Sequence, residues 1–77
     1  MKSENENLSN DDLIYELNIT LEAMLIYAGV RRDKLQAAAQ AYIENIDEVL
    51  QNSDAQGADE PIAVVEFLRA NKPELFN

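Results

Sequence analysis

The sequence predicts a small all-α protein, a three-helix up-down-up bundle built from a helical hairpin and a shorter third helix. Three observations support this class. Apolar residues recur at alternating steps of three and four in three segments. Residues that favour helix ends bound each segment, and no strand-like pattern runs for more than a few positions. With 77 residues, the chain is expected to form a single helical domain over residues 1–77.

The first helix is predicted over residues 9–28, after a flexible N-terminal arm at residues 1–8 that carries no hydrophobic period. Ser9 and Asp12 have the spacing of a capping box, which satisfies free N–H groups at a helix start. Gly29 is expected to end the helix in the left-handed conformation. One side carries what we term the main stripe, which is expected to face the core: Ile14, Leu17, Leu21, Met24 and Ala28, with Leu13 and Leu25 at its edges.

The second helix is predicted over residues 33–51, where Asp33 and Gln36 repeat the capping-box spacing. Only a short turn separates it from the first helix, so the two are expected to form an antiparallel hairpin. Alanines, which are the best helix formers, follow its first turn. Its buried face is expected to hold Leu35, Ala39, Tyr42, Ile46 and Val49.

The third helix is predicted over residues 60–71, after a linker at residues 52–59 that is rich in small and turn-forming residues. Pro61 suits its first turn, and one of the two acidic residues before Pro61 is expected to cap it. Pro73 ends the helix and begins a tail at residues 72–77. The most buried side chains of the bundle are expected to be Leu17, Leu21, Leu35, Tyr42, Ile46, Val65 and Leu68.

The composition argues against catalysis and against metal binding. The chain has no cysteine and no histidine, so it lacks thiol chemistry, the commonest metal ligand and the usual general base at neutral pH. It has two glycines, too few for a phosphate-binding loop. We therefore expect no enzyme, no catalytic residue, no cofactor and no metal site.

No apolar run approaches the roughly 20 residues that a membrane-spanning helix needs. The first ten residues are polar and acidic, which is the opposite of a secretory signal. A cytoplasmic protein without membrane contact is therefore expected.

Charge is distributed unevenly along the chain, whose net charge is −9. Apart from Lys2, the basic residues fall in the turn between the first two helices and at the end of the third. In an up-down-up bundle these two places meet, so we expect a basic pole made of Arg31, Arg32, Lys34, Arg69 and Lys72. The second helix is expected to carry an acidic face made of Glu44, Asp47 and Glu48. Favourable interactions with helix dipoles are the alternative explanation for part of this distribution.

The first helix has more apolar residues than one stripe needs. Tyr15, Ile19 and Ile26 lie on the side opposite the main stripe, and we term them the second patch. Two alternatives are open for it. The third helix covers it, or it is the surface of a homodimer or of a complex with another protein.

The leading hypothesis is a small acidic protein–protein interaction module, a regulator or inhibitor of bacterial or phage type. A chain with this charge is expected to bind a basic partner, including nucleic-acid-binding proteins, and to form a homodimer. The alternative is a helix-turn-helix-like nucleic-acid-binding protein, with Gly29 in the turn and Arg31, Arg32 and Lys34 at the start of the recognition helix. The net charge disfavours nucleic acid as a partner, because it repels the phosphate backbone.

Overall fold

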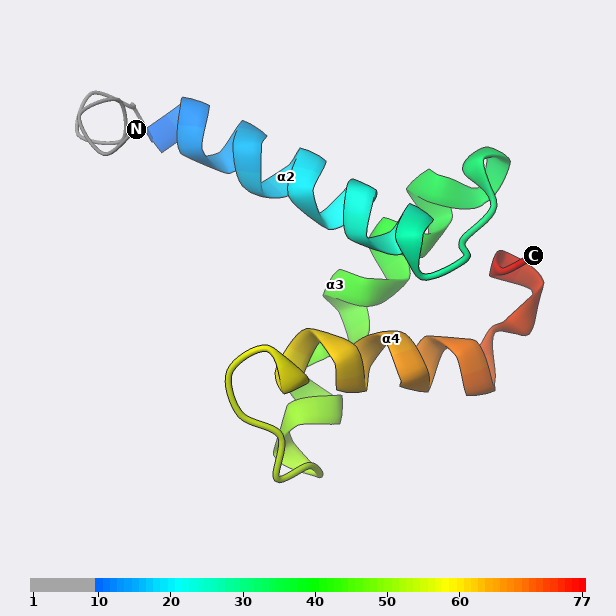
Figure 1. Cartoon of the computed structure of the whole chain (residues 1–77). Coiled ribbons are helices and arrows are strands. Elements are labelled where there is room, and N and C mark those ends of the chain that lie inside the picture. Colours follow the sequence, from blue (N-terminus) through cyan, green and yellow to red (C-terminus); the bar gives the residue numbers. More distant parts are fainter. Residues whose placement is uncertain (1–9) are drawn as a thin grey trace.

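The computed structural model describes residues 10–77, and within them it confirms the predicted all-α class with three α-helices (Figure 1). The end of α2 and both ends of α3 and α4 lie within two residues of the predicted ones, and the predicted cap Ser9 lies outside the described residues. The elements are α2 (Asn10–Tyr27), the short 3-10 helix η1 (Arg32–Lys34), α3 (Leu35–Gln51), α4 (Asp59–Asn71) and the 3-10 helix η2 (Pro73–Leu75).

The starts of α3 and α4 differ from the predicted capping pattern. Neither helix has a side-chain hydrogen bond at its N-cap, which is Lys34 for α3 and Ala58 for α4. The prediction that Asp33 begins the second helix with a capping box is therefore wrong. Asp33 lies in η1, and its carboxylate accepts two hydrogen bonds from the guanidinium of Arg31, at 3.1 and 2.9 Å. The carboxylate of Asp33 therefore binds the guanidinium of Arg31 and not an N–H group at the start of α3.

The end of α2 follows the prediction made from Gly29. This residue has φ +106°, a conformation that strains any residue with a Cβ atom. The N–H of Val30 donates to the carbonyl of Leu25 at 3.0 Å, and the N–H of Gly29 donates to the carbonyl of Ile26 at 3.0 Å. These are the two hydrogen bonds of a Schellman motif, which satisfies the last carbonyl groups of a helix.

The C-terminal segment, predicted as a tail, is part of the folded body. The N–H of Arg31 donates to the carbonyl of Leu75 at 2.9 Å, and the N–H of Asn77 donates to the carbonyl of Gly29 at 2.8 Å. Val30 and Phe76 form an isolated antiparallel bridge between these hydrogen bonds. Figure 1 shows the end of the chain beside the turn that follows α2. The last residues therefore close the turn between α2 and α3.

We term residues 72–77 the closing segment. The core lies between α3, α4, the C-terminal end of α2 and this closing segment. Both α2 and α4 pack on α3. The buried hydrophobic residues are Leu25, Val30, Ala38, Ala41, Tyr42, Val64, Val65, Leu68, Leu75 and Phe76. The predicted burial of Tyr42, Val65 and Leu68 is confirmed, whereas Leu21, Leu35 and Ile46 are only partly buried against this cluster.

The prediction that Leu17 belongs to the core is wrong. All residues from 10 to 20, which we term the projecting half of α2, are exposed, and Leu17 is 61% exposed. A helix of 18 residues is about 27 Å long, and α2 is anchored to the body only at its C-terminal end (Figure 1). The radius of gyration is accordingly 13.7 Å, against about 11 Å for a compact chain of this size.

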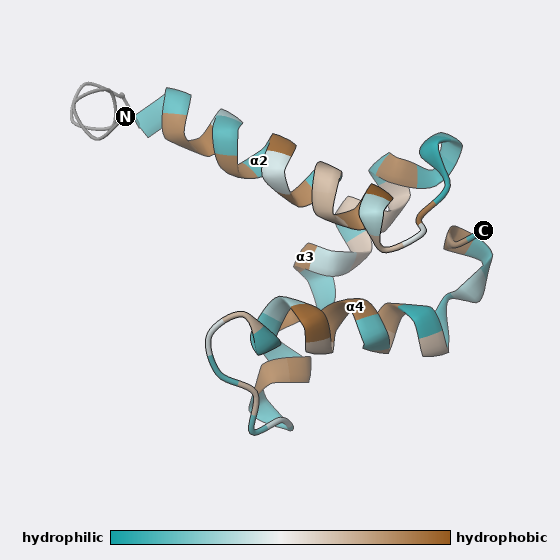
Figure 2. Cartoon of the chain, in the orientation of Figure 1, coloured by the Kyte–Doolittle hydropathy of each residue, from teal (hydrophilic) through white to brown (hydrophobic). Residues whose placement is uncertain are grey.

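The projecting half of α2 carries hydrophobic residues although it lies outside the core. Figure 2 shows hydrophobic residues along the whole of α2, including the exposed projecting half. Even so, no helix in the described part of the chain is long and apolar enough to cross a membrane. The apolar residues of the projecting half are therefore a feature that the fold of one chain leaves unexplained.

A first prediction concerns the closing segment. Leu75 is 5% exposed, so Leu75→Ala should lower the free energy of unfolding by about 2–5 kcal/mol, as other buried leucines do. The matched control is Ile43→Ala, because Ile43 is an aliphatic residue that is 57% exposed; it should change stability by about 0.5 kcal/mol or less. Chemical denaturation measures both values. Equal stability losses in the two variants would show that the segment does not belong to the core.

Candidate interaction surfaces

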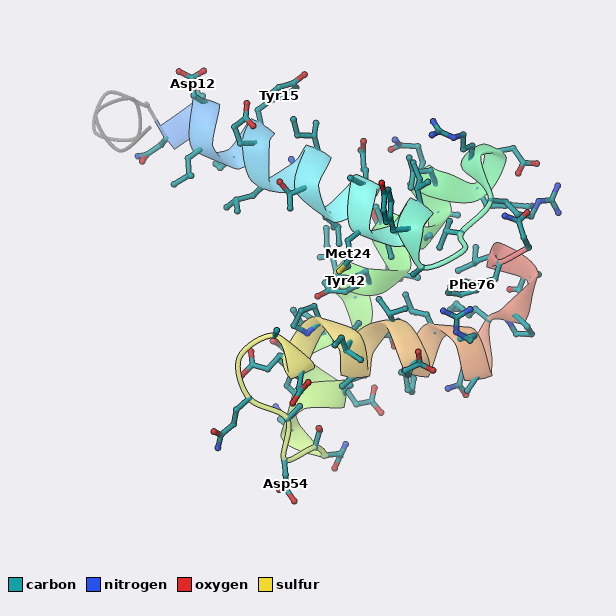
Figure 3. All side chains as sticks on the ribbon, in the orientation of Figure 1. Asp12, Tyr15, Met24, Tyr42, Asp54 and Phe76 are labelled. Atoms are coloured by element: carbon teal, nitrogen blue, oxygen red, sulfur yellow. The ribbon has the colours of Figure 1, made fainter. Side chains whose placement is uncertain are left out.

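The second patch is uncovered over the projecting half of α2. Tyr15 is 63% and Ile19 38% exposed, and Ile26, closer to the body, is partly buried. Tyr15 points away from the body in Figure 3, whereas Met24 on the main stripe points toward it. The third helix of the fold, α4, lies beside Met24 and Ala28, on the side opposite the patch. The possibility that this helix covers Tyr15 and Ile19 is therefore excluded.

Acidic residues border the second patch. Asp12 lies three residues before Tyr15, and Glu22 lies three residues after Ile19, so each is a neighbour on the helix surface. No basic residue occurs in α2. The surface is thus a small apolar patch between carboxylates, on a helix that stands away from the body.

The predicted acidic face is present on α3. Glu44, Asp47 and Glu48 are all exposed, and the side-chain amide of Gln40 donates to the carboxylate of Glu44 at 2.9 Å. Ile43 is exposed beside them. The face therefore combines negative charge with one apolar side chain.

The structure also brings together the two groups of basic residues. The Arg69 guanidinium, from the last turn of α4, donates to the carbonyl of Ala28 at 2.7 Å. Its carbon atom lies 4.7 Å from the centre of the Phe76 ring. Arg69 thereby joins the end of α4, the end of α2 and the closing segment, and it places a positive charge at the negative end of the α2 dipole.

Two arginines of the basic pole make contacts within the chain. Arg69 has the contacts described above, and Arg31 pairs with Asp33 at 2.9 Å. Lys34 and Lys72 are partly buried, and Arg32 is exposed. On the surface of the first turns of α3, Gln36, Ala37 and Gln40 are exposed, so alanine occupies a position where base recognition needs a polar side chain. The helix-turn-helix alternative stays a hypothesis with few groups to read a sequence.

The acidic residues do not gather at a single opposite pole. Figure 3 shows Asp12 and Asp54 on widely separated parts of the molecule, because α2 begins far from the linker between α3 and α4. In an up-down-up bundle, the start of the first helix and the linker after the second helix would lie at the same end. Negative charge is instead spread over the projecting helix, α3 and the linker.

A groove that the sequence did not reveal lies between α2 and α4. It has a volume of about 260 Å³ and is lined by Met24, Ala28, Ile62, Val65, Glu66 and Arg69. An ion pair at its charged end joins Arg69 Nε and Glu66 Oε2 over 3.7 Å. Met24 and Ala28 belong to the main stripe, so the groove continues the apolar side of α2 onto α4. The only sequence signal for the groove was that the main stripe of the first helix is longer than the predicted third helix that could cover it.

The described residues include no group of three side chains suited to hold a metal ion. Burial, and then the negative charge of Glu60, raise the pKa of the Tyr42 hydroxyl above its ordinary value of 10.0. Tyr42 is a core residue between α3 and α4, so we interpret this shift as a consequence of packing.

No protein-family model matches the chain, and comparison with curated proteins and with solved structures gave no significant match. Its function must therefore follow from its own surfaces.

A second prediction concerns Arg69. Arg69→Gln should lower the free energy of unfolding, because it removes a charged hydrogen bond to the end of α2. The loss should be only about 1 kcal/mol, since the arginine is partly solvated. The control is Arg32→Gln at an exposed arginine of the same pole, which should change stability by about 0.5 kcal/mol or less. Thermal and chemical denaturation compare the two. If both variants lose the same stability, the bond to Ala28 contributes nothing specific.

A third prediction follows from the raised pKa of Tyr42. The unfolded chain releases this phenolic proton near pH 10, whereas the folded chain holds it more tightly. The unfolded state therefore binds fewer protons above pH 10, and the free energy of unfolding should fall as the pH rises through that range. Tyr42→Phe should remove the most alkaline part of the tyrosine absorbance titration of the folded protein. A titration that Tyr42→Phe leaves unchanged at its alkaline end would contradict this.

Proposed function

We propose that the protein is an interaction module that binds a basic partner protein through the second patch on α2. The observation that carries the proposal is the exposure of Tyr15 and Ile19 on a helix that projects from the body. Tyrosine and isoleucine at such a place have no folding role to explain them, whereas tyrosine is enriched in the buried centres of protein interfaces.

The carboxylates around the patch determine the chemistry of the partner. Asp12 and Glu22 on α2 and the acidic face of α3 give the molecule negative charge on two of its helices. A basic protein is drawn to such a surface over several ångströms, and the attraction raises the association rate more than it slows dissociation. The apolar side chains then hold the contact once water has left it. A nucleic-acid-binding protein has the basic surface that this arrangement fits.

A module of this kind regulates or inhibits its partner by occupying the surface that the partner uses for an acidic ligand. The small size of the chain and the lack of histidine and cysteine support a binding role, which we propose for the cytoplasm, rather than catalysis.

A fourth prediction tests the proposal with the immobilised protein and a fractionated cell extract. The double variant Tyr15→Lys/Ile19→Lys should capture at most about one-tenth of the basic protein that the wild type captures. It removes the apolar contact and reverses the local charge. The matched control, Gln56→Lys/Ala70→Lys, adds the same charge at two exposed positions elsewhere and should retain most of it. Capture should weaken at high salt, since screening shortens the reach of surface charges.

The same variants give the outcome that would reject the proposal. Equal capture by both double variants would show that the second patch is not the binding surface. Tight binding of duplex DNA by the wild type, abolished by Arg31→Glu/Arg32→Glu and falling steeply with salt, would favour the helix-turn-helix alternative. Wild-type protein that binds no duplex DNA at physiological salt agrees with the proposal.

A further inference from the structure

The main stripe of α2 continues past the body without a partner. Leu21, Met24 and Ala28 pack against the core cluster, and the same side of the helix then carries Leu17, Ile14 and Leu13 in the projecting half. These three side chains are 61%, 56% and 47% exposed. One apolar surface thus runs the length of α2, and its second half is only partly covered, because Leu21 and Met24 are partly buried.

This surface extends into the groove beside α4. Met24 and Ala28 form one wall of the groove, and Ile62 and Val65 form the other. Ile62 is itself 54% exposed. The exposed part of the main stripe and the open groove therefore form one continuous apolar surface, with a projecting helix at one end and a receiving groove at the other.

We propose that this surface binds a second copy of the chain as an antiparallel pair of α2 helices, related by a two-fold axis near the middle of α2. The projecting half of each copy then lies along the second half and the groove of the other. Leu17 of one copy packs against Leu21 of the partner subunit, and Leu13 lies beside Met24 of the partner subunit. Each copy supplies both the helix and the groove, which a two-fold interface requires.

Charge favours the antiparallel direction. The projecting half carries Asp11, Asp12 and Glu16 and no base, and α2 ends beside Arg31 and Arg69. The antiparallel pair places the acidic start of each helix near the basic end of the other, with opposed helix dipoles side by side. A parallel pair would place acid beside acid and base beside base.

A second copy also covers the exposed apolar side chains of the main stripe, Leu13, Ile14 and Leu17. The second patch lies on the opposite side of α2 and stays open in this dimer, so the dimer goes beyond the proposed binding of a basic partner and does not compete with it.

Solution mass tests the proposal on the full chain. Sedimentation equilibrium of the wild type should give twice the 8.7 kDa chain mass, with dissociation on dilution. Leu17→Glu should raise the dissociation constant at least about a hundredfold, because it buries a charge at the centre of the interface. Tyr15→Glu, the matched control on the opposite side of the same helix, should stay dimeric. Far-UV circular dichroism checks that both variants remain folded, as expected from substitutions at exposed helix positions.

Disulfide trapping tests the direction, since the chain has no cysteine of its own. In the antiparallel pair, equivalent residues near the two ends lie about 15–18 Å apart, too far for a disulfide. Mixed Leu13→Cys and Met24→Cys chains should therefore form a linked heterodimer, and neither variant alone should do so. Efficient linkage of either variant to itself would overturn the antiparallel arrangement.

Two further outcomes would overturn the dimer. One is a wild type that stays monomeric at every concentration, and the other is a dimer that Leu17→Glu leaves intact. If the wild type is monomeric and Leu17→Glu reduces capture of a foreign protein, the main stripe serves that protein instead. The binding of a basic partner through Tyr15 and Ile19 is tested by its own variants, so it can stand when the dimer fails.

Discussion

The arrangement of this chain depends on how the last residues close the turn after α2. The hydrogen bonds from Arg31 to Leu75 and from Asn77 to Gly29 join segments that are far apart in sequence. Arg69 adds a third link through the carbonyl of Ala28. Together they hold the C-terminal end of α2 near the start of α3 and the end of α4. Among the described residues, no backbone hydrogen bond of this kind joins the exposed residues 10–20 to another element.

This one-ended attachment explains why the molecule has both a small core and a large apolar surface. A chain of this length buries only about 60% of the surface that it exposes when unfolded, and here the apolar residues among the exposed positions 10–20 lie outside the core cluster. No disulfide is available to compensate, because the sequence has no cysteine. Association is the remaining source of stability. The two sides of the projecting half can serve different purposes, with the main stripe used for a second copy and the second patch for a basic partner.

Local sequence patterns predicted the helices well, because apolar periodicity, Gly29 and the two prolines act over a few residues. The position of α2 could not be predicted in the same way. The part of the main stripe around Leu17 has the same period as the part around Leu25, and only the second part packs against other elements. That difference depends on the closing segment, where Leu75 and Phe76 follow a proline and show no period. Of the candidate sites, the meeting of Arg69 with the α2–α3 turn followed from the pattern, whereas the pattern left open whether another helix covers Tyr15. The groove did not, because it depends on the angle at which α2 leaves the body.

Site-resolved amide hydrogen exchange at two protein concentrations tests most directly whether α2 is held at one end only. At low concentration, amides of residues 14–20 should exchange much faster than those of residues 64–68 in the core of α4, because local opening of the projecting half breaks no tertiary contact. At high concentration the first set should become protected while the second changes little. Slow exchange of residues 14–20 at low concentration, equal to that of residues 64–68, would show that α2 packs along the body of its own chain and would contradict the account.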